Sequence, residues 1–353
     1  MPAQTPAPVP DDRRRRIRVL EELDPPDGTT RFVDQVTRHL DDDVEVDYFT
    51  WRKGLLSRYD VLHLHWPERL VRGYKRPRTL VNYALVLALG LRARLLRVAV
   101  VQTEHNLAPH ERGGPLERAV MGWLGRQVTA SIRLNRSTPP RPGAQDHLVP
   151  HGDYREPFAG LPRHDAVPGR LAYVGIIREY KGVDRLLAEF ARLDDPDLTL
   201  RVVGRPADAR WRALVEAAVA ADPRVSARLT FVPDDELVAE VTEAELVVLP
   251  YAQLHNSGTL LVALSLGRPV LAPAGPAPRE LQAEVGADWV RLYEGPLTAE
   301  LVRAELDAVR GGLPGEPDLT GRDWPSVGAR HAEVFRAAVT AARGARRSTG
   351  TGR

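Results

Sequence analysis

The sequence predicts an α/β protein built from two doubly wound parallel-sheet domains that face each other across a cleft. Short apolar segments typical of buried strands alternate with segments of helical periodicity along almost the whole chain. The alternation is interrupted by a Pro- and Gly-rich stretch at 151–169 and then restarts. A length of 353 residues also exceeds what a single core usually organises. Because alternating strands and helices build parallel sheets, each half is expected to form one such domain.

Composition narrows the class of protein before any motif is considered. With 43% hydrophobic and 27% charged residues the chain is expected to be globular. The absence of cysteine excludes disulfides and thiolate metal sites and agrees with a cytoplasmic location. No uninterrupted apolar run is long enough to predict a membrane span, and no signal peptide is predicted. A net charge of +2 and 6% aromatic residues argue against nucleic-acid binding.

The first domain is expected at 17–155, after a flexible basic tail at 1–16. The tail contains Arg13–Arg16, which is more typical of a solvated terminus than of a phosphate or lipid contact. Short apolar runs predict strands at Ile17–Leu20, Val44–Phe49, Val61–Leu64, Val98–Val101, Ala130–Leu134 and His147–Val149. Apolar periodicity predicts helices at Phe32–Leu40 and Leu116–Leu124. The loop before the first helix contains Gly28 and Thr29, where a Thr could cap the helix and the loop could face a ligand.

Two charged segments of this domain have more than one explanation. The acids Asp41–Asp43 could bind a divalent metal, but three acids between a helix and a strand also form an ordinary polar loop. The segment Arg69–Arg97 contains a helical apolar face and many basic residues at its flanks. The apolar face consists of Leu80, Tyr83, Leu87 and Leu91. This segment could lie on a membrane surface, or it could be a core helix with basic ends.

Polar residues follow two predicted strands of the first domain. They are His65 and Glu68 after Val61–Leu64, and His105, His110 and Glu111 after Val98–Val101. Because ligands bind at the carboxyl ends of parallel strands, both loops are candidates to face a substrate. The His and Glu residues of the second loop could also form a metal cluster or a satisfied polar loop. Their spacing differs from the helical His-x-x-x-His pattern of zinc enzymes.

The second domain is expected at 170–324, after a linker at 156–169. Strands are predicted at Arg170–Val174, Leu198–Val203, Leu229–Val232, Leu246–Pro250 and Val270–Ala272, and helices at Val183–Leu193, Trp211–Ala221, Asp235–Thr242 and Thr259–Leu266. A last helix, about Val327–Ala342, belongs to a terminal segment at 325–343, and the tail 344–353 is expected to be disordered. There is no Gly-x-Gly-x-x-Gly fingerprint and no Walker A loop, which disfavours NAD and P-loop chemistry.

Two basic residues after the first strand of the second domain indicate a diphosphate site. Arg178 and Lys181 lie three residues apart between two glycines, and the only other lysines are Lys53 and Lys75. An arginine fork and a lysine point charge together suit a pyrophosphate. A solvated turn would be the simpler explanation of the same residues.

The turn Asn256–Gly258, between a buried strand and a helix, is a second candidate for this site. Asn256, Ser257 and Gly258 suit a helix N-cap with close backbone approach, and the free N–H groups there could bind an anion. A capped helix without a ligand explains the same residues. Three further positions are expected near a nucleoside because they follow neighbouring strands. They are Gly204, Val232 and Pro233.

These features together favour a transferase that needs no metal. Charge on a leaving diphosphate would be stabilised by Arg178, Lys181 and helix N–H groups. An acceptor hydroxyl in the first domain would also need a base, for which His105 is the first candidate and Glu111 the second. The positions expected on the acceptor side are Gly28, Thr29, His65, Glu68 and His110.

The chain resembles the GT-B glycosyltransferases, particularly the family 4-like group and the bacterial xanthan-type polysaccharide mannosyltransferases. The resemblance rests on VLHLHWPE (61–68), TEHNLAPHE (103–111), YVGIIREYKG (173–182), VVGRP (202–206) and NSGTLLVALSLGRPV (256–270), and it covers most of both halves. It implies a nucleotide-sugar donor in the second domain, an acceptor in the first, no metal or other cofactor, and a last helix that crosses back. By position, Arg178 and Lys181 match diphosphate-binding residues of the family, and His105 matches a residue near the donor sugar.

One motif of the retaining members is absent. Their Glu-x₇-Glu pair would fall on Leu254 and Val262, so the ribose contact and the donor-sugar contact of those glutamates are both missing. This departure is compatible with an inverting enzyme, or with a donor held through Asn256, Ser257 and backbone groups.

The expected function is therefore that of a cytoplasmic hexosyltransferase acting in polysaccharide biosynthesis. It would move a sugar from a nucleoside-diphosphate sugar, with GDP-mannose favoured by the resemblance alone, to a hydroxyl of a glycan or lipid-linked acceptor. A peripheral contact with the inner membrane face would fit such an acceptor. A nucleotide-sugar epimerase or hydrolase on the same fold would instead turn over the donor alone. A catalytically silent binding subunit is the alternative from another class, favoured by the missing glutamates and opposed by the retained Arg178, Lys181 and His105.

Overall fold

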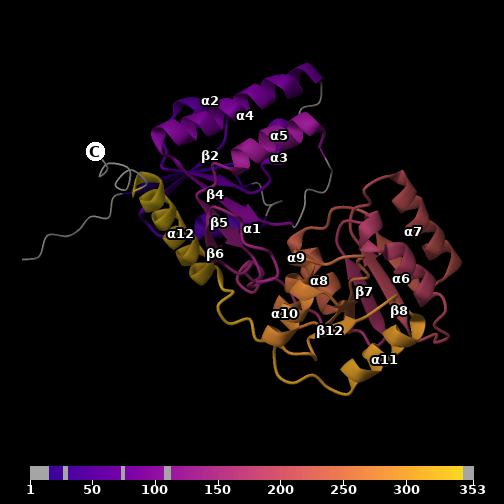
Figure 1. Cartoon of the computed structure of the whole chain (residues 1–353). Helices are drawn as coiled ribbons and strands as arrows, with labels where there is room; N and C mark the ends of the chain where they lie inside the picture. The colour runs from indigo at the N-terminus through magenta and orange to yellow at the C-terminus, as the bar shows by residue number, and fades with distance from the viewer. Residues whose placement is uncertain (1–15, 27–30, 73–75, 107–112, 345–353) are drawn as a thin grey trace, which may run out of the picture.

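The computed structural model describes residues 16–26, 31–72, 76–106 and 113–344. Two α/β domains follow one another along the chain, each built around a parallel six-stranded sheet (Figure 1). The predicted fold class is confirmed, and most predicted elements lie within a few residues of their expected positions.

The first domain has the sheet order β2-β1-β3-β4-β5-β6. Its strands are β1 (Ile17–Glu21), β2 (Val44–Tyr48), β3 (Val61–Leu64), β4 (Ala99–Glu104), β5 (Ala130–Arg133) and β6 (Gln145–Leu148). Its helices are α1 (Arg31–Arg38), α2 (Trp51–Leu56), α3 (Glu68–Val71), α4 (Arg76–Leu96) and α5 (Pro115–Gly125). One core cluster joins the sheet to α1, and a second joins its other side to α3, α4 and α5. Burial on both faces explains why the central strands are continuous apolar runs.

The second domain has the sheet order β12-β11-β10-β7-β8-β9 and one continuous core. Its strands are β7 (Arg170–Val174), β8 (Thr199–Val203), β9 (Val225–Arg228), β10 (Leu246–Val248), β11 (Val270–Pro273) and β12 (Val290–Tyr293). Its helices are α6 (Val183–Phe190), α7 (Ala209–Ala221), α8 (Asp234–Thr242), α9 (Gly258–Ser265), α10 (Pro276–Val285) and α11 (Ala299–Arg310), with a short 3₁₀ turn at Glu179–Lys181. Tyr154 and Phe158, which precede β7, pack into this second core.

The last helix, α12 (Trp324–Gly344), lies against the first domain although it follows the second domain in the chain (Figure 1). Its residues Trp324 and Phe335 are fully buried in the core cluster that contains α1. The two helices approach closely at Gly328, where an added Cβ would lie 2.0 Å from the carbonyl oxygen of His39. Only glycine fits such an approach, so this residue fixes the packing of α12 on α1.

The three acids Asp41–Asp43 have a structural partner on α12. The Arg336 guanidinium lies 2.6 Å from an Asp41 oxygen and 2.5 Å from an Asp43 oxygen. These ion pairs help to hold α12 in place. They therefore favour the interpretation of this segment as an ordinary polar loop over a metal site.

One predicted strand is wrong. Leu229–Val232 is not a strand, and the edge strand β9 ends one residue earlier, at Arg228. The apolar residues that suggested a strand instead line a cavity of the second domain, and the Phe231 side chain is 63% exposed. An apolar run predicts burial or a ligand surface equally well, and periodicity alone does not separate the two.

The buried face of α4 also differs from the apolar face noted in the sequence. Leu80, Leu87 and Leu91 are exposed, whereas Val86 and Leu89 are fully buried. The helix carries apolar residues on both faces, so the sequence pattern could not select one. The buried face of α4 is instead determined by its contact with α5, since an added Cβ on Gly90 would lie 2.2 Å from the Trp123 ring.

Candidate active site

Each sheet has one position where the chain order reverses, and polar residues gather at both. In the first sheet the reversal lies between β1 and β3, and in the second between β7 and β10. Ligands of doubly wound sheets bind outside the carboxyl ends of the strands at such a switch point. The two switch points are therefore the candidate sites for ligand binding and catalysis.

The first switch point contains a buried network of one carboxylate and three histidines. Glu21 at the end of β1 accepts hydrogen bonds from His63 Nδ1 at 2.8 Å and from His65 Nε2 at 3.0 Å. His63 Nε2 lies 2.9 Å from the Thr103 hydroxyl, and His65 Nδ1 lies 2.9 Å from His105 Nε2. The side chains of Glu21, His63 and His65 are almost completely inaccessible to water.

The charges of this network follow from its burial. Burial alone would raise the pKa of Glu21, but the neighbouring His63 and His65 outweigh that effect and hold the pKa of the carboxyl well below its usual range. Burial lowers the pKa of the His65 imidazole to about 4, and it lowers the pKa of His105 well below the ordinary histidine value. The switch point therefore holds a carboxylate close to the imidazoles of His65 and His105, which are neutral near pH 7.

His105 is the residue through which this network reaches a cavity. Its ring stacks on Trp66, with the centroids 4.4 Å apart, and meets Phe32 edge-on at 5.1 Å. Glu22 holds the backbone after β3 in place, since its carboxyl group accepts hydrogen bonds from the N–H groups of His65 and Trp66 at 3.2 and 3.0 Å. Burial raises the pKa of Glu22 to about 7. The His105 ring is thus held on several sides while 9% of the residue remains exposed.

A cavity of about 340 Å³ adjoins His65 and His105 in the first domain. Charged residues on its walls are paired with each other. Arg72 lies 3.1 Å from Glu117, and Arg141 lies 2.7 Å from Glu104. Glu68, expected on the acceptor side, also lines this cavity. Polar walls beside a histidine suit a hydroxyl-rich ligand such as a sugar.

The Glu21, His63 and His65 ligand atoms also lie within 4.8 Å of one another, which is close enough to hold a metal ion. Each of these atoms, however, already has a hydrogen-bond partner within the group. The distances of 2.8 and 3.0 Å are those of ordinary hydrogen bonds. The hydrogen-bonded network therefore accounts for the arrangement.

The second switch point is built from glycines. An added Cβ on Gly204, at the end of β8, would lie 2.0 Å from the carbonyl oxygen of Gly175, at the end of β7. Both residues have φ values, 143° and 129°, that side chains rarely permit. They line a cavity of about 660 Å³ together with Phe231, Val232 and Thr259. The close backbone approach leaves room for a ligand where side chains would otherwise lie.

A lysine stands at the edge of these glycines. Lys181 Nζ lies 3.0 Å from the Tyr251 hydroxyl, and an added Cβ on Gly175 would lie 3.2 Å from the same nitrogen. Burial lowers the pKa of Lys181 from its usual value. Arg178, three residues earlier, is exposed. A half-buried cation beside an open backbone surface is suited to an anionic ligand.

The N-terminus of α9 points to the same region. Ser257 caps the helix, since its hydroxyl accepts the Leu260 N–H at 3.3 Å. Gly258 and Thr259, the first residues of the helix, line the cavity that contains Gly175 and Gly204. The positive end of a helix adds to the attraction for an anion.

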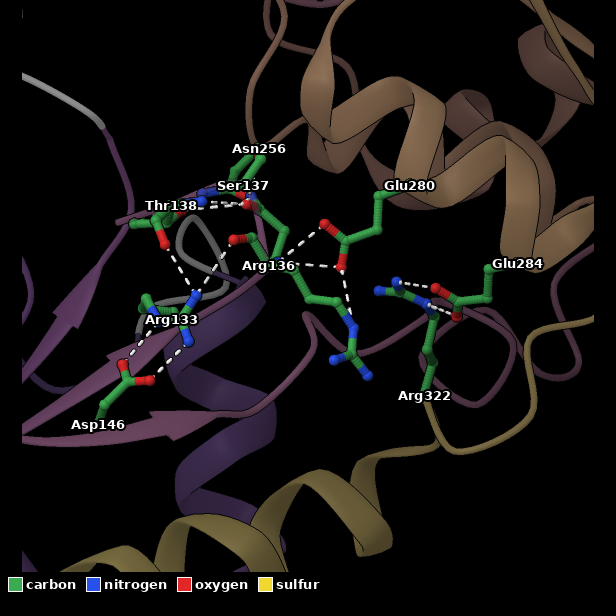
Figure 2. Close-up of polar contacts among 10 residues, drawn as sticks. Arg133, Arg136, Ser137, Thr138, Asp146, Asn256, Glu280, Glu284 and Arg322 are labelled. Atoms are coloured by element: carbon green, nitrogen blue, oxygen red, sulfur yellow. Dashed lines mark hydrogen bonds and ion pairs between the residues drawn. The ribbon is translucent and has the colours of Figure 1, made fainter. Parts of the chain in front are cut away.

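The two switch points are joined by a contact between the domains. Asn256 Nδ2 donates to the carbonyl oxygen of His105 at 2.8 Å, and its Oδ1 accepts from Asn135 Nδ2 at 2.7 Å. Figure 2 shows the surrounding contacts, in which the backbone N–H of Arg136 donates to Glu280 and Arg322 forms an ion pair with Glu284. His105 is thereby placed directly beside the loop that leads into α9.

The structure brings most of the predicted site residues to these two places. His65, Glu68 and His105 border the first cavity, and Gly204, Val232 and Gly258 border the second. Pro233 precedes α8 next to Val232, and Lys181 and Ser257 lie beside the second cavity. Asn256, predicted to bind a diphosphate, donates a hydrogen bond to the His105 carbonyl of the first domain. Gly28, Thr29, His110 and Glu111 fall outside the described residues.

Sequence reasoning missed Glu21, His63 and Tyr251. A signal for Glu21 was present, because an acid that directly follows an apolar strand at a sheet's carboxyl end is a candidate site residue. His63 lay inside a predicted buried strand, where a polar residue needs a partner. Nothing local indicated that Tyr251 would meet Lys181.

Comparison with known proteins agrees with this geometry. Residues 168–301 match the family model described as glycosyl transferases group 1. A GDP-mannose:glycolipid 4-β-D-mannosyltransferase of Xanthomonas campestris pv. campestris is 47% identical over 91% of this chain and 92% of its own length. A 2-deoxystreptamine N-acetyl-D-glucosaminyltransferase of Streptomyces fradiae is 30% identical over 82% of this chain and 62% of its own length.

Solved structures show the same fold. Anabaena HepE in complex with UDP superposes with a TM-score of 0.58 at 12% identity, covering 95% of this chain and 100% of that one. WaaG, a glycosyltransferase involved in lipopolysaccharide biosynthesis, gives a TM-score of 0.50 at 17% identity and the same coverage. At these identities the likeness concerns the arrangement of the two domains.

Proposed function

The chain belongs to the group 1 glycosyltransferases of GT-B fold, and on that premise we propose that it transfers mannose from GDP-mannose to a glycolipid hydroxyl. The observation that carries the proposal is the contact between Asn256 and the His105 carbonyl, 2.8 Å long. This contact supports the proposal because it joins a histidine of the first domain to the loop before α9, which is proposed to bind the anion. The donor and acceptor names come from the Xanthomonas relative.

The second switch point is proposed to hold the nucleoside diphosphate. Lys181 and Arg178 would offset the charge of the phosphates, and the N–H groups at the start of α9 would donate to them. The nucleoside would lie along Gly204, Val232 and Pro233, and the exposed Phe231 ring offers a surface for the base. Because protein groups supply the positive charge, no divalent metal is required for the leaving group.

The proposed reaction is a single displacement. The acceptor oxygen attacks the anomeric carbon, its proton passes to His105, and the bond to the diphosphate breaks with both electrons leaving on GDP. The donor carries its mannose in α linkage, so the β linkage in the relative's name corresponds to inversion. Val262 supports this route, because it lines the donor cavity where retaining members have a glutamate.

The test is a transfer assay with purified protein, a mannosylatable glycolipid and a panel of UDP-, GDP-, ADP- and dTDP-sugars. GDP-mannose should give product with β configuration by NMR, and activity should persist in EDTA. Hydrolysis or epimerisation of the donor without acceptor would contradict the proposal. Activity that is lost in EDTA and restored by Mg²⁺ would contradict the metal-independent mechanism.

The outer face of α4 is proposed to rest on the cytoplasmic face of the inner membrane. Thr79–Leu96 has the length and hydropathy of a membrane-crossing segment, but its inner face packs into the first domain. Its exposed apolar residues are Leu80, Val81, Leu87, Leu91, Leu95 and Leu96. Arg94 and Arg97, both exposed, flank them and would attract anionic lipid. Such a surface would bring the adjacent cavity to a lipid-linked acceptor.

Vesicle flotation can test this surface. The protein should float with vesicles that contain anionic phospholipid, and Leu95→Glu with Leu96→Glu should abolish flotation while transfer to a soluble acceptor analogue is kept. Val167→Glu, an exposed apolar position in the second domain, is the matched control. Equal flotation of the α4 variant and the control would contradict the assignment.

A further inference from the structure

We infer that Glu21 and His65 are positioning residues that fix the tautomer of His105, leaving its Nδ1 unprotonated and available to the acceptor hydroxyl. The inference rests on the proposed function for its catalytic meaning. The chain of contacts that carries it runs from Glu21 through His65 to His105, with donor–acceptor distances of 3.0 and 2.9 Å. Each hydrogen in this chain can be assigned in turn.

The assignment starts at Glu21, which can only accept hydrogen bonds when ionised. Its two oxygens are each met by a ring nitrogen, His63 Nδ1 and His65 Nε2. Both nitrogens must therefore carry a hydrogen. The far nitrogen of His63 faces the Thr103 hydroxyl, which can donate or accept. The His63–Thr103 contact therefore does not restrict which nitrogens of His65 and His105 carry a hydrogen.

The His65–His105 contact at the other end of the network allows only one placement of the hydrogens. Because His65 is buried and neutral, a hydrogen on Nε2 leaves Nδ1 without one. His65 Nδ1 can then only accept, so His105 Nε2 must be the donor across the 2.9 Å contact. His105 is neutral for the same reason, and its hydrogen is therefore on Nε2. The lone pair is left on Nδ1.

His105 Nδ1 is the nitrogen that the network does not use. Within the described parts of the chain it has no hydrogen-bond partner, and the residue lines the cavity proposed to receive the acceptor. The ring cannot easily turn, because Trp66 covers one face and Phe32 meets its edge. A fixed neutral imidazole with a free Nδ1 is a suitable general base.

Glu21 has a second effect once the proton has moved. Protonation of His105 Nδ1 creates an imidazolium in a site where charge is poorly solvated. The carboxylate lies beyond His65 and supplies the opposite charge that stabilises this transient cation. Loss of the Glu21 charge should therefore slow the chemical step more than it weakens donor binding, since the donor is held by the other domain.

The first experiment reads the tautomer directly in the wild-type protein. Histidine labelled with ¹⁵N should give, for His105, the chemical shift of a protonated Nε2 and an unprotonated Nδ1 near pH 7, assigned through loss of the signals in His105→Gln. The opposite tautomer would overturn the inference even if mannose transfer is observed. One tightly bound zinc ion per chain, measured by elemental analysis, would also overturn it, because a metal would replace the hydrogens of the network.

The second experiment separates a positioning role from a structural one. Glu21→Gln should lower kcat about 100-fold, the lower end of what general-base catalysis contributes, with KM for GDP-mannose changed less than about threefold. His331→Leu is the matched control, since His331 is equally buried in the same core but bonds only to a backbone carbonyl. Equal loss of kcat in both variants would overturn the inference.

The two experiments also distinguish the inference from the proposed function. If Glu21→Gln fails to fold, judged by thermal unfolding and GDP binding, the tautomer of His105 measured in the wild-type protein still tests the inference. If no donor in the panel is transferred, the proposed function fails, while the tautomer of His105 remains measurable.

Discussion

The two domains have the same sheet topology apart from their edges, yet their switch points are opposite in charge and in filling. The first is occupied by side chains: a buried carboxylate, Glu21, and imidazoles that burial keeps neutral. The second is left open by Gly175 and Gly204 and bordered by a half-buried cation, Lys181. In the proposed function, one fold thus supplies a proton acceptor on one side and an anion site on the other.

The difference follows from what each ligand needs. A diphosphate is large and charged, so backbone N–H groups and a cation must approach it closely, and glycine permits that approach. A hydroxyl needs only one oriented nitrogen, and orienting it requires packing from all sides. We therefore propose that the filled switch point serves chemistry and the open one serves binding.

His105→Ala should have the largest effect and tests whether chemistry belongs to the first domain. Transfer should fall about 1,000-fold, within the range that general-base catalysis contributes, because no other group replaces the imidazole. The Kd of GDP, measured by calorimetry, should change less than twofold because the donor is bound elsewhere. Unchanged turnover would remove His105 from the mechanism.

Arg178→Ala combined with Lys181→Ala tests whether binding belongs to the second domain. Loss of two charge-assisted contacts should weaken GDP binding about 100-fold, or roughly 2.7 kcal/mol. The combined Arg192→Ala and Arg212→Ala variant removes the same charge from surface ion pairs of this domain and should bind normally. Equal GDP affinity in both double variants would disprove the diphosphate site.

Much of the fold could be predicted because the parallel strands are buried on both faces. The strands Val61–Leu64 and Arg170–Val174 were predicted with their observed boundaries, since each is a short apolar run between polar loops. The prediction failed where apolar residues serve another purpose. Thr230–Val232 of the wrongly predicted strand lines a cavity, and Leu80 and Leu91 on α4 face outward.

The site was predicted in part for a related reason. Loop residues at strand ends, such as His65, His105 and Lys181, are visible in the sequence because the fold class places them. The partners that give them their properties come from distant positions: Glu21 is 44 residues from His65, and Tyr251 is 70 residues from Lys181. Such pairing depends on the register between strands, which no local pattern encodes.

Acid should affect the two domains unequally. Burial lowers the pKa of His65 and His151 to about 4 and of His331 to about 3, so unfolding lets each bind a proton below pH 6.5. Glu22 opposes them, because burial raises its pKa to about 7 and the folded state binds its proton first. His105, whose pKa burial also lowers, makes four histidines against one carboxyl, so the unfolded state binds more protons and stability should fall as pH falls.

The expected loss is about 3 kcal/mol in the free energy of unfolding between pH 7 and pH 5.5. It can be measured by urea titration at the two pH values, and His331→Leu should show about 1 kcal/mol less of it. Nucleotide binding by the second domain at pH 5.5 should persist while the protein stays folded. Stability that rises towards pH 5.5 would contradict the assignment of neutral histidines.

The smallest expected effect concerns the contact that joins the two switch points. Asn256→Ala removes the hydrogen bonds to the His105 carbonyl and to Asn135, of which each contributes about 1 kcal/mol, so kcat/KM should fall roughly 30-fold. In a double-mutant cycle with Asn135→Ala the losses should not add, because the two residues share one bond. Glu280→Gln, which keeps an oxygen for the Arg136 N–H, should stay within twofold. A larger effect of Asn256→Ala on GDP affinity than on turnover would support the predicted diphosphate role of Asn256. The residue would then belong to the donor-binding site of the second domain and not to the contact that positions His105.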